Sequence, residues 1–237
     1  MTADLPATTA RVQLLVKPGC HLCAEAEATV AQVCDARGEA WEAVDGAAHP
    51  AILVPDAVLA MGALAREIVR RVREHSPTTV IGITGSAGKT TTKDLLAALL
   101  ATQGPTVAPV GSYNGEVGVP LTVFRAELDT RFLVVEMGAD HVGNIAYLCD
   151  LVRPDIGVVL MVGTAHAGSF GGVANIARTK GELVEALGPD GIAVLNLDDE
   201  RVAGMAARTA APITWFTADE RGVARAAEDV AAGRASG

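Results

Sequence analysis

Aromatic residues make up only 3% of this 237-residue sequence, and its 19 basic residues are outnumbered by 28 acidic ones. The net charge of −9 argues against a general nucleic-acid-binding surface, because such surfaces are rich in Lys and Arg. It does not exclude a nucleotide ligand, since a single loop can bind phosphates locally. The abundance of Ala, Val and Gly is typical of α/β packing.

Long apolar runs are also missing. None reaches the length of a membrane-spanning helix, and the N-terminus lacks a basic region followed by an apolar stretch. We therefore expect a cytoplasmic protein with no membrane insertion. Only two of the four cysteines, Cys20 and Cys23, have the spacing of a motif, which excludes a secreted disulfide framework.

The most informative stretch is residues 79–93. The β-branched run 79–84 predicts a buried strand, the small residues 85–88 predict a turn, and a helix is expected from Lys89. In such an arrangement the loop N–H groups and the helix N-terminus face an anion, Lys89 neutralises it, and the Thr90 hydroxyl can hold Mg²⁺. The sequence therefore predicts a phosphate-binding loop.

The match to the general Gly-x-x-x-x-Gly-Lys-[Ser/Thr] pattern is incomplete, because its first glycine would stand at Ile83. The sequence has the shorter Gly85-x-x-Gly88 instead. An ordinary glycine turn between a strand and a helix is the alternative. We favour phosphate binding because Lys-Thr stands where the mechanism needs it.

Polar residues follow several further predicted strands. These strands are expected at residues 106–110, 132–135, 156–162 and 192–195, with helices at about 143–152, 172–188 and 198–208. The alternation predicts an α/β fold with a parallel sheet and helices on both faces, where ligands lie at the carboxyl ends of strands. Glu136, His166 and Asn196 all fall at such ends. Each also has a simpler reading, as a solvated acid, a loop histidine or a helix cap, but Glu136 and His166 suit a catalytic divalent cation.

Lys180 lies on the apolar stripe of the predicted helix 172–188. A lysine there must extend its amine to solvent, pair with an acid, or be modified. Close to a metal site, addition of CO₂ would turn the cation into a carbamate, an anionic oxygen ligand.

The N-terminal segment follows another pattern. A strand at 12–16, Cys20-His-Leu-Cys23, a helix at about 24–36 and a strand at 41–44 resemble the opening of the glutaredoxin-like family. The resemblance covers about residues 11–45 and implies a partial thioredoxin-like β-α-β segment with possible redox roles for the two cysteines. The second half of that fold is not found, which disfavours redox activity, and a zinc site would need a second cysteine pair.

From residue 51 onward the sequence resembles the Mur ligase superfamily, and within it the type-F branch. The motifs that carry this resemblance are Gly85-Ser-Ala-Gly-Lys-Thr-Thr91, Ser112-Tyr-Asn114, Gly118-Val-Pro120, Glu136-Met-Gly138, Pro154-Asp155, Ala165-His166, Lys180-Gly-Glu182 and Asn196-Leu-Asp-Asp199. The resemblance implies a ligase that uses ATP and Mg²⁺ to join D-alanyl-D-alanine to UDP-N-acetylmuramoyl-tripeptide through an acyl phosphate.

The resemblance also implies roles for individual residues. ATP would be bound by Gly85, Ser86, Ala87, Gly88, Lys89, Thr90, Thr91, Asn114 and Asn196, the last near the adenine. One Mg²⁺ would be bound by Thr90 and Glu136, and His166 and a carbamylated Lys180 would bind or steer a second. Lys89, His166 and Lys180 are the candidate catalytic residues.

Two departures limit what the resemblance implies. Gly115 stands where the family usually has a second Asn, which removes one polar contact near the phosphates. We also expect residues 1–50 to be the glutaredoxin-like fragment, residues 51–78 a linking strand and helix, and residues 79–237 a C-terminally truncated central ATP-binding domain. This chain would then retain only the ATP-binding part of the ligase. The alternatives are a thiol-disulfide redox module fused to a nucleotide-binding domain, and a non-catalytic nucleotide-binding protein.

Overall fold

The computed structural model describes residues 12–16, 40–45, 54–164 and 170–218, together with residues 28, 31, 34, 35 and 38. The chain divides into two compact units, Met1–Pro55 and Asp56–Gly237. The domain boundaries expected at residues 50 and 78 stay predictions.

In the first unit, β1 (Val12–Val16) and β2 (Trp41–Asp45) pair in parallel, with Val12 opposite Trp41. Both strands lie where the sequence predicts them. Cys20 and Cys23 lie outside the described residues. The thioredoxin-like segment and its redox chemistry therefore stay predictions.

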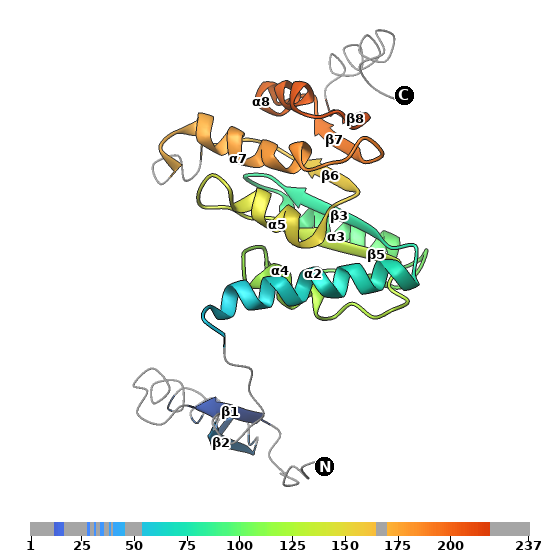
Figure 1. Ribbon diagram of the computed structural model, residues 1–237. Coiled ribbons are helices and arrows are strands. Elements are labelled where there is room, and N and C mark those ends of the chain that lie inside the picture. Colours follow the sequence, from blue (N-terminus) through green and yellow to red (C-terminus); the bar gives the residue numbers. More distant parts are fainter. Residues whose placement is uncertain are drawn as a thin grey trace. The chain divides into compact units, whose positions relative to one another are not determined.

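The second unit is organised around one parallel sheet of six strands in the order β4-β5-β3-β6-β7-β8 (Figure 1). The strands are β3 (Thr79–Thr84), β4 (Thr106–Val107), β5 (Phe132–Glu136), β6 (Ile156–Val159), β7 (Ile192–Asn196) and β8 (Ile213–Phe216). β3, which precedes the predicted phosphate loop, lies between β5 and β6. This position is in the interior of the sheet, as its β-branched sequence predicts.

Helices cover both faces of this sheet, which confirms the predicted fold class. One face carries α2 (Ala57–His75), α4 (Gly118–Val123), α5 (Asn144–Val152) and α7 (Val173–Glu185). The other carries α3 (Lys89–Leu100), which packs on Ile81 and Ile83 of β3. Because side chains alternate along a strand, Val80 of β3 packs in the larger core on the opposite face.

Several predicted elements differ in length or type. The strand expected at 106–110 is only two residues long, β6 ends at Val159, and the helix expected at 198–208 is α8 (Glu200–Ala203) followed by a 3₁₀ helix, η2 (Gly204–Arg208). Of the strand expected at 51–54, residues 51–53 lie outside the described part and Val54 is not in a strand.

Two elements of the structure were not predicted from the sequence. Helix α4 begins inside the glycine-rich stretch 111–120 and accommodates Pro120 in its first turn, where a missing N–H costs no helical hydrogen bond. Strand β8 has the β-branched and aromatic residues that favour strands.

The sequence predicts an apolar face with Leu59 and Leu64 on the helix that follows Pro55, and one with Leu95, Leu96, Leu99 and Leu100 on the helix from Lys89. Leu96 and Leu100 do pack on the core, but the other four leucines are exposed. Leu59 and Leu64 of α2 are 60% and 55% exposed, and Leu95 and Leu99 of α3 are 64% and 68% exposed. The side of α2 that packs on α5 uses small residues instead. A Cβ at Gly62 would collide with the Tyr147 hydroxyl, so close helix packing replaces the leucine stripe that the sequence suggested.

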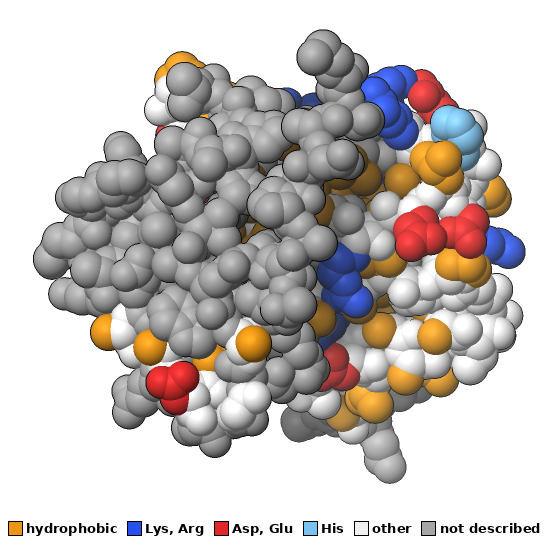
Figure 2. All heavy atoms as spheres, turned by 90° about the horizontal axis from the view of Figure 1, so that it is seen from below, with side chains coloured by type: hydrophobic (Ala, Val, Ile, Leu, Met, Phe, Trp, Pro, Cys, Tyr) orange, Lys and Arg blue, Asp and Glu red, His pale blue; other side chains and the backbone are white. Residues whose placement is uncertain are grey.

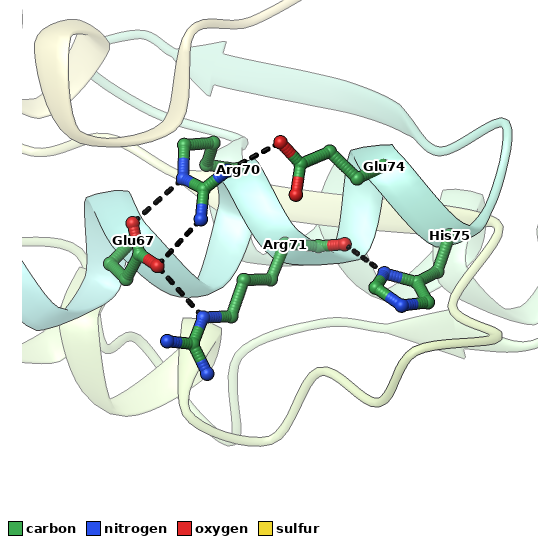
Figure 3. Close-up of polar contacts among 5 residues, drawn as sticks. All are labelled: Glu67, Arg70, Arg71, Glu74 and His75. Carbon is green, nitrogen blue, oxygen red and sulfur yellow. Dashed lines mark hydrogen bonds and ion pairs between the residues drawn. The ribbon is translucent and has the colours of Figure 1, made fainter.

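The exposed side of α2 carries a ladder of ion pairs (Figure 3). Glu67 accepts hydrogen bonds from Arg70 and Arg71, Arg70 also pairs with Glu74, and Nδ1 of His75 lies 2.8 Å from the Arg71 carbonyl. The hydrogen bonds from Arg70 and Arg71 lower the pKa of Glu67 to about 2.

Acidic, basic and apolar side chains are interspersed over the described part of the face seen in Figure 2. Within the described residues, no helix is long and apolar enough to span a membrane.

Candidate active site at the carboxyl ends of β3 and β5

The neighbouring strands β3 and β5 send the chain to opposite faces of the sheet. After β3 the chain enters α3 on one face, and after β5 it enters α5 on the other. Such a reversal opens a crevice at the carboxyl ends of the two strands, which is where parallel α/β sheets bind ligands. The predicted phosphate loop and Glu136 both lie at this point.

The phosphate loop, residues 85–90, contains two glycines whose conformation or close packing a side chain would prevent. Gly88 has φ of 82°, a left-handed conformation that suits glycine, and α3 begins at the next residue. A Cβ at Gly85 would lie 2.9 Å from the Cβ of Leu160, so this glycine allows close packing on the residue that follows β6. Lys89 Nζ donates to the Gly85 carbonyl at 3.0 Å, which folds the lysine back over the loop.

Three side chains meet at the end of β5. Thr90 Oγ1 donates to Oε2 of Glu136 at 3.0 Å, and Asn114 Nδ2 donates to Oε1 of the same carboxylate at 2.8 Å. Glu136 is only 1% exposed. One carboxylate and one hydroxyl beside a phosphate loop fit Mg²⁺, because this cation binds one or two carboxylates together with substrate phosphates.

Gly138, two residues after Glu136, lies where only a residue without a side chain fits. Its N–H donates to the Asn114 carbonyl at 2.7 Å, and a Cβ at this position would lie 2.6 Å from Asn114 Oδ1. The close approach of the two backbones therefore places the Asn114 amide against Glu136. This contact gives a structural reason for the glycine of the Glu136-Met-Gly138 motif. From the sequence alone, the motif indicates only a family resemblance.

The loop that follows Gly138 is held by two residues, Asn144 and Glu182, whose roles were not predicted from the sequence. Asn144 Oδ1 accepts the N–H groups of Asp140 and His141, each at 3.1 Å. Glu182 of α7 accepts the N–H groups of Gly143 at 2.7 Å and Ala146 at 3.0 Å, and so caps the N-terminus of α5 from another helix. The spacing of Glu182 from Lys180 gives no signal of this long-range cap.

A cavity of about 640 Å³ lies over this crevice. Its walls include Gly85, Ser86 and Lys89 of the phosphate loop, Asn114, the loop residues Asp140 and His141, and Lys180. Lys180 is 7% exposed, as its place on an apolar stripe predicts. Burial, followed by the nearby Lys89 charge, lowers the pKa of Lys180 to about 8. The structure thus brings Gly85, Ser86 and Lys89 of the phosphate loop to one cavity with Asn114 and Lys180, whereas Ala87, Gly88, Thr90 and Thr91 are not in its lining.

Other predicted site residues lie elsewhere or are not described. Asn196, at the end of β7, lies two strands away from β3 and outside the cavity lining; its amide donates to the Leu160 carbonyl at 2.8 Å. His166 lies outside the described residues, so its predicted role as a ligand stays a prediction. Among the residues that the structure describes, no group of three His, Cys, Asp or Glu side chains is placed to hold a metal ion.

Asp155 of the Pro154-Asp155 motif lies at the amino end of β6, whereas the site lies at the carboxyl ends of the strands. Its carboxylate accepts the Val80 N–H at 2.7 Å and pairs with Arg73 at 2.8 Å. This motif therefore joins α2, β3 and β6, which is a structural role.

Comparison with known proteins relates residues 83–235 to the family described as the Mur ligase middle domain. A UDP-N-acetylmuramoyl-tripeptide–D-alanyl-D-alanine ligase from Mycobacterium bovis is 55% identical over 144 residues, which are 61% of this chain and 28% of the relative. The enzyme of the same name from Escherichia coli is 39% identical over 150 residues, which are 63% of this chain and 32% of the relative.

Solved structures give the same relation. The MurF ligase from Thermotoga maritima in complex with ADP superposes with a TM-score of 0.63 at 29% identity, over 88% of this chain and 47% of that one. A MurF structure from Acinetobacter baumannii has a TM-score of 0.65 at 28% identity, over 92% and 49%. The chain thus spans about a third of the two curated relatives and about half of the two solved structures.

Proposed function

Because this chain belongs to the Mur ligase family through its middle domain, we propose that its second unit binds Mg–ATP for an acyl-phosphate-forming peptide ligase. One observation carries the proposal: the Thr90 hydroxyl, the Asn114 amide and the phosphate loop converge on the buried carboxylate of Glu136. The hydrogen-bond partners of Glu136 among the described residues, Thr90 and Asn114, are neutral. A buried carboxylate is costly unless a cation joins it, and Mg²⁺ bound to ATP would supply that cation.

Individual residues have distinct roles in this proposal. The N–H groups of residues 85–91 and the Lys89 ammonium bind the phosphates of ATP, since the N-terminus of α3 is directed at them. Thr90 and Glu136 would hold Mg²⁺, and the cation would supply positive charge to the phosphoryl group that is transferred. Asn196 would lie near the adenine, and His166 with a carbamylated Lys180 would hold or steer a second cation.

The substrates are proposed from the names of the relatives. A carboxylate oxygen of UDP-N-acetylmuramoyl-tripeptide attacks the γ-phosphorus of ATP, and ADP leaves. The amine of D-alanyl-D-alanine then attacks the acyl phosphate carbon, loses a proton to give the amide, and phosphate leaves. The reaction belongs to the cytoplasm, where ATP is available.

The three functional alternatives differ in what they require. The relatives matched by this chain are named as ligases, which does not favour the redox alternative. A non-catalytic nucleotide-binding protein would share the ATP site but would form no product. We propose that the residues described here supply the ATP-binding part of the ligase.

Lys180 offers one test of the site. Its burial and its place in the cavity wall support carbamylation. We expect ¹³C-labelled bicarbonate to give a carbamate NMR signal in the wild-type chain that is lost in Lys180→Ala. The substitution should weaken Mg–ATP binding by roughly tenfold, the lower end for residues that support a metal site, and a short-chain carboxylic acid should restore part of the affinity. No carbamate signal together with no rescue would contradict the modification.

Phosphate release tests the proposed function as a whole. The purified chain is incubated with Mg–ATP and UDP-N-acetylmuramoyl-tripeptide, with and without D-alanyl-D-alanine. We expect Mg–ATP to bind without dipeptide-dependent release of phosphate. Release that depends on the dipeptide would show that this chain suffices for the ligase reaction and would contradict an ATP-binding role alone.

A further inference from the structure

Lys93 is a buried cation for which neither the sequence motifs nor the proposed ATP site has a use. It lies in the second turn of α3 and is only 1% exposed. Its ammonium contacts the carbonyl of Pro109 at 3.0 Å, the carbonyl of Gly111 at 3.0 Å and Oδ1 of Asp94 at 2.5 Å. An ammonium has three N–H donors, so these three acceptors use all of them.

Two of these acceptors lie at the start of the segment that carries Asn114. This segment, residues 108–117, joins β4 to α4 and is called the Asn114 loop below. Gly111 has φ of 60° and lies in a turn, so the carbonyls that Lys93 holds are at the point where the loop turns. Three residues later, Asn114 binds Glu136 through its side chain and Gly138 through its carbonyl.

Helix α3 therefore contacts Glu136 by two routes. Thr90, in its first turn, donates directly to Oε2 of Glu136. Lys93 lies three residues further, so it shares the same side of the helix, and it holds the loop whose Asn114 donates to Oε1. Both oxygens of the carboxylate are thus oriented from one helix.

We propose that Lys93 is a positioning residue, which fixes the Asn114 loop so that Glu136 presents its carboxylate to the cation of Mg–ATP. This inference rests on the proposed function. Lys93 itself does not reach the nucleotide, because its donors are all occupied within the protein. Its loss would leave the loop without its anchor to α3, and Asn114 would hold Oε1 of Glu136 less firmly.

The test compares nucleotide binding with and without the cation. The whole chain and its Lys93→Met variant, which keeps an unbranched side chain of similar length, are titrated with ATP in Mg²⁺ and in EDTA. We expect Lys93→Met to lower the affinity measured in Mg²⁺ by roughly tenfold, as for other residues that orient a metal ligand, and to change the affinity in EDTA by less than about twofold. In an Asn114→Ala background, Lys93→Met should have almost no further effect, because both changes act through the same contact.

Gly62→Ala is the matched control, because it destabilises the packing of α2 on α5 without touching the site. It should leave both affinities unchanged. If Lys93→Met does not fold, Lys93→Arg keeps the charge but has a planar donor set, and it should show the same selective loss. Equal losses in Mg²⁺ and EDTA, or full additivity with Asn114→Ala, would overturn the role of Lys93 alone. A wild-type chain whose affinity for ATP does not depend on Mg²⁺ would overturn the proposed function and this inference together.

Discussion

Replacing Glu136 with Gln is expected to abolish the Mg²⁺ dependence of ATP binding while leaving the fold intact or more stable. Gln can keep both hydrogen bonds, since its Oε1 accepts from Asn114 and its Nε2 donates to the Thr90 hydroxyl. It removes the charge that attracts the cation. Hydrogen bonds and contacts to charged groups are worth roughly 1.5–3 kcal/mol, so affinity for Mg–ATP should fall by about tenfold to a hundredfold.

The stability of the same variant should change in the opposite direction. Glu136 is buried and its described partners, Thr90 and Asn114, are neutral, so its charge costs folding free energy when no cation is bound. Without nucleotide, the neutral variant should be more stable by about 1 kcal/mol, or about 2–4 °C in the melting temperature of a domain of this size. Such a gain is expected where a binding site holds a charge for function.

Glu127→Gln is the matched control for Glu136→Gln. Glu127 is an exposed acid that lies before β5, at the other end of the strand from Glu136. Its substitution should change neither Mg–ATP affinity nor melting temperature. Calorimetric titration and thermal melts of the two variants measure both effects, and a Glu136→Gln chain that still needs Mg²⁺ for tight ATP binding would contradict the assignment.

Replacing Gly138 with Ala should damage both the site and the fold. The new methyl group would lie 2.6 Å from Asn114 Oδ1, and Asn114 cannot simply withdraw because the Gly138 N–H holds its carbonyl. Overpacking of this kind costs about 1–3 kcal/mol of unfolding free energy. Displacement of the Asn114 amide from Glu136 should also lower Mg–ATP affinity by roughly tenfold.

Gly115→Ala provides the same chemical change three residues before α4, in the Asn114 loop itself. A Cβ at Gly115 would meet no heavy atom of another segment within 4 Å, so this variant should bind Mg–ATP like the wild-type chain. Combining Gly138→Ala with Asn114→Ala should cost less than the sum of the two, since removal of the amide makes room for the methyl group. Equal behaviour of Gly138→Ala and Gly115→Ala would contradict the close-approach explanation.

Patterns that repeat along the chain made much of this fold predictable. The β-branched run 79–84 and its glycine loop specify β3, the phosphate loop and the start of α3, because each local preference agrees with the next. The unusual position of Lys180 was predictable for the opposite reason, since a charged side chain on the apolar face of a helix conflicts with the local pattern. Conflicts of this kind are expected at functional sites.

Contacts between distant segments could not be predicted from these patterns. The sequence gives no indication that Glu182 caps α5, that Asn114 packs on Gly138, or that Lys93 holds the Asn114 loop. Each of these contacts joins segments that are distant in the sequence and meet only in the folded protein. The exposure of Leu59 and Leu64 on α2 and of Leu95 and Leu99 on α3 was not predicted either, whereas Leu96 and Leu100 of α3 pack on the core as predicted. On α2, close packing at Gly62 and Ala65 sets part of the buried face, which the positions of the leucines do not reveal.

Titration of the purified chain with Mg–ATP, beside its Lys89→Ala variant, tests the ATP site most directly. Lys89 lies in the cavity wall at the start of α3, where its ammonium would meet the phosphates of a bound nucleotide. We predict saturable binding by the wild-type chain and an affinity lower by roughly tenfold to a hundredfold in Lys89→Ala, the effect of losing one charged contact. No binding by the wild-type chain, or equal binding by both, would contradict the account.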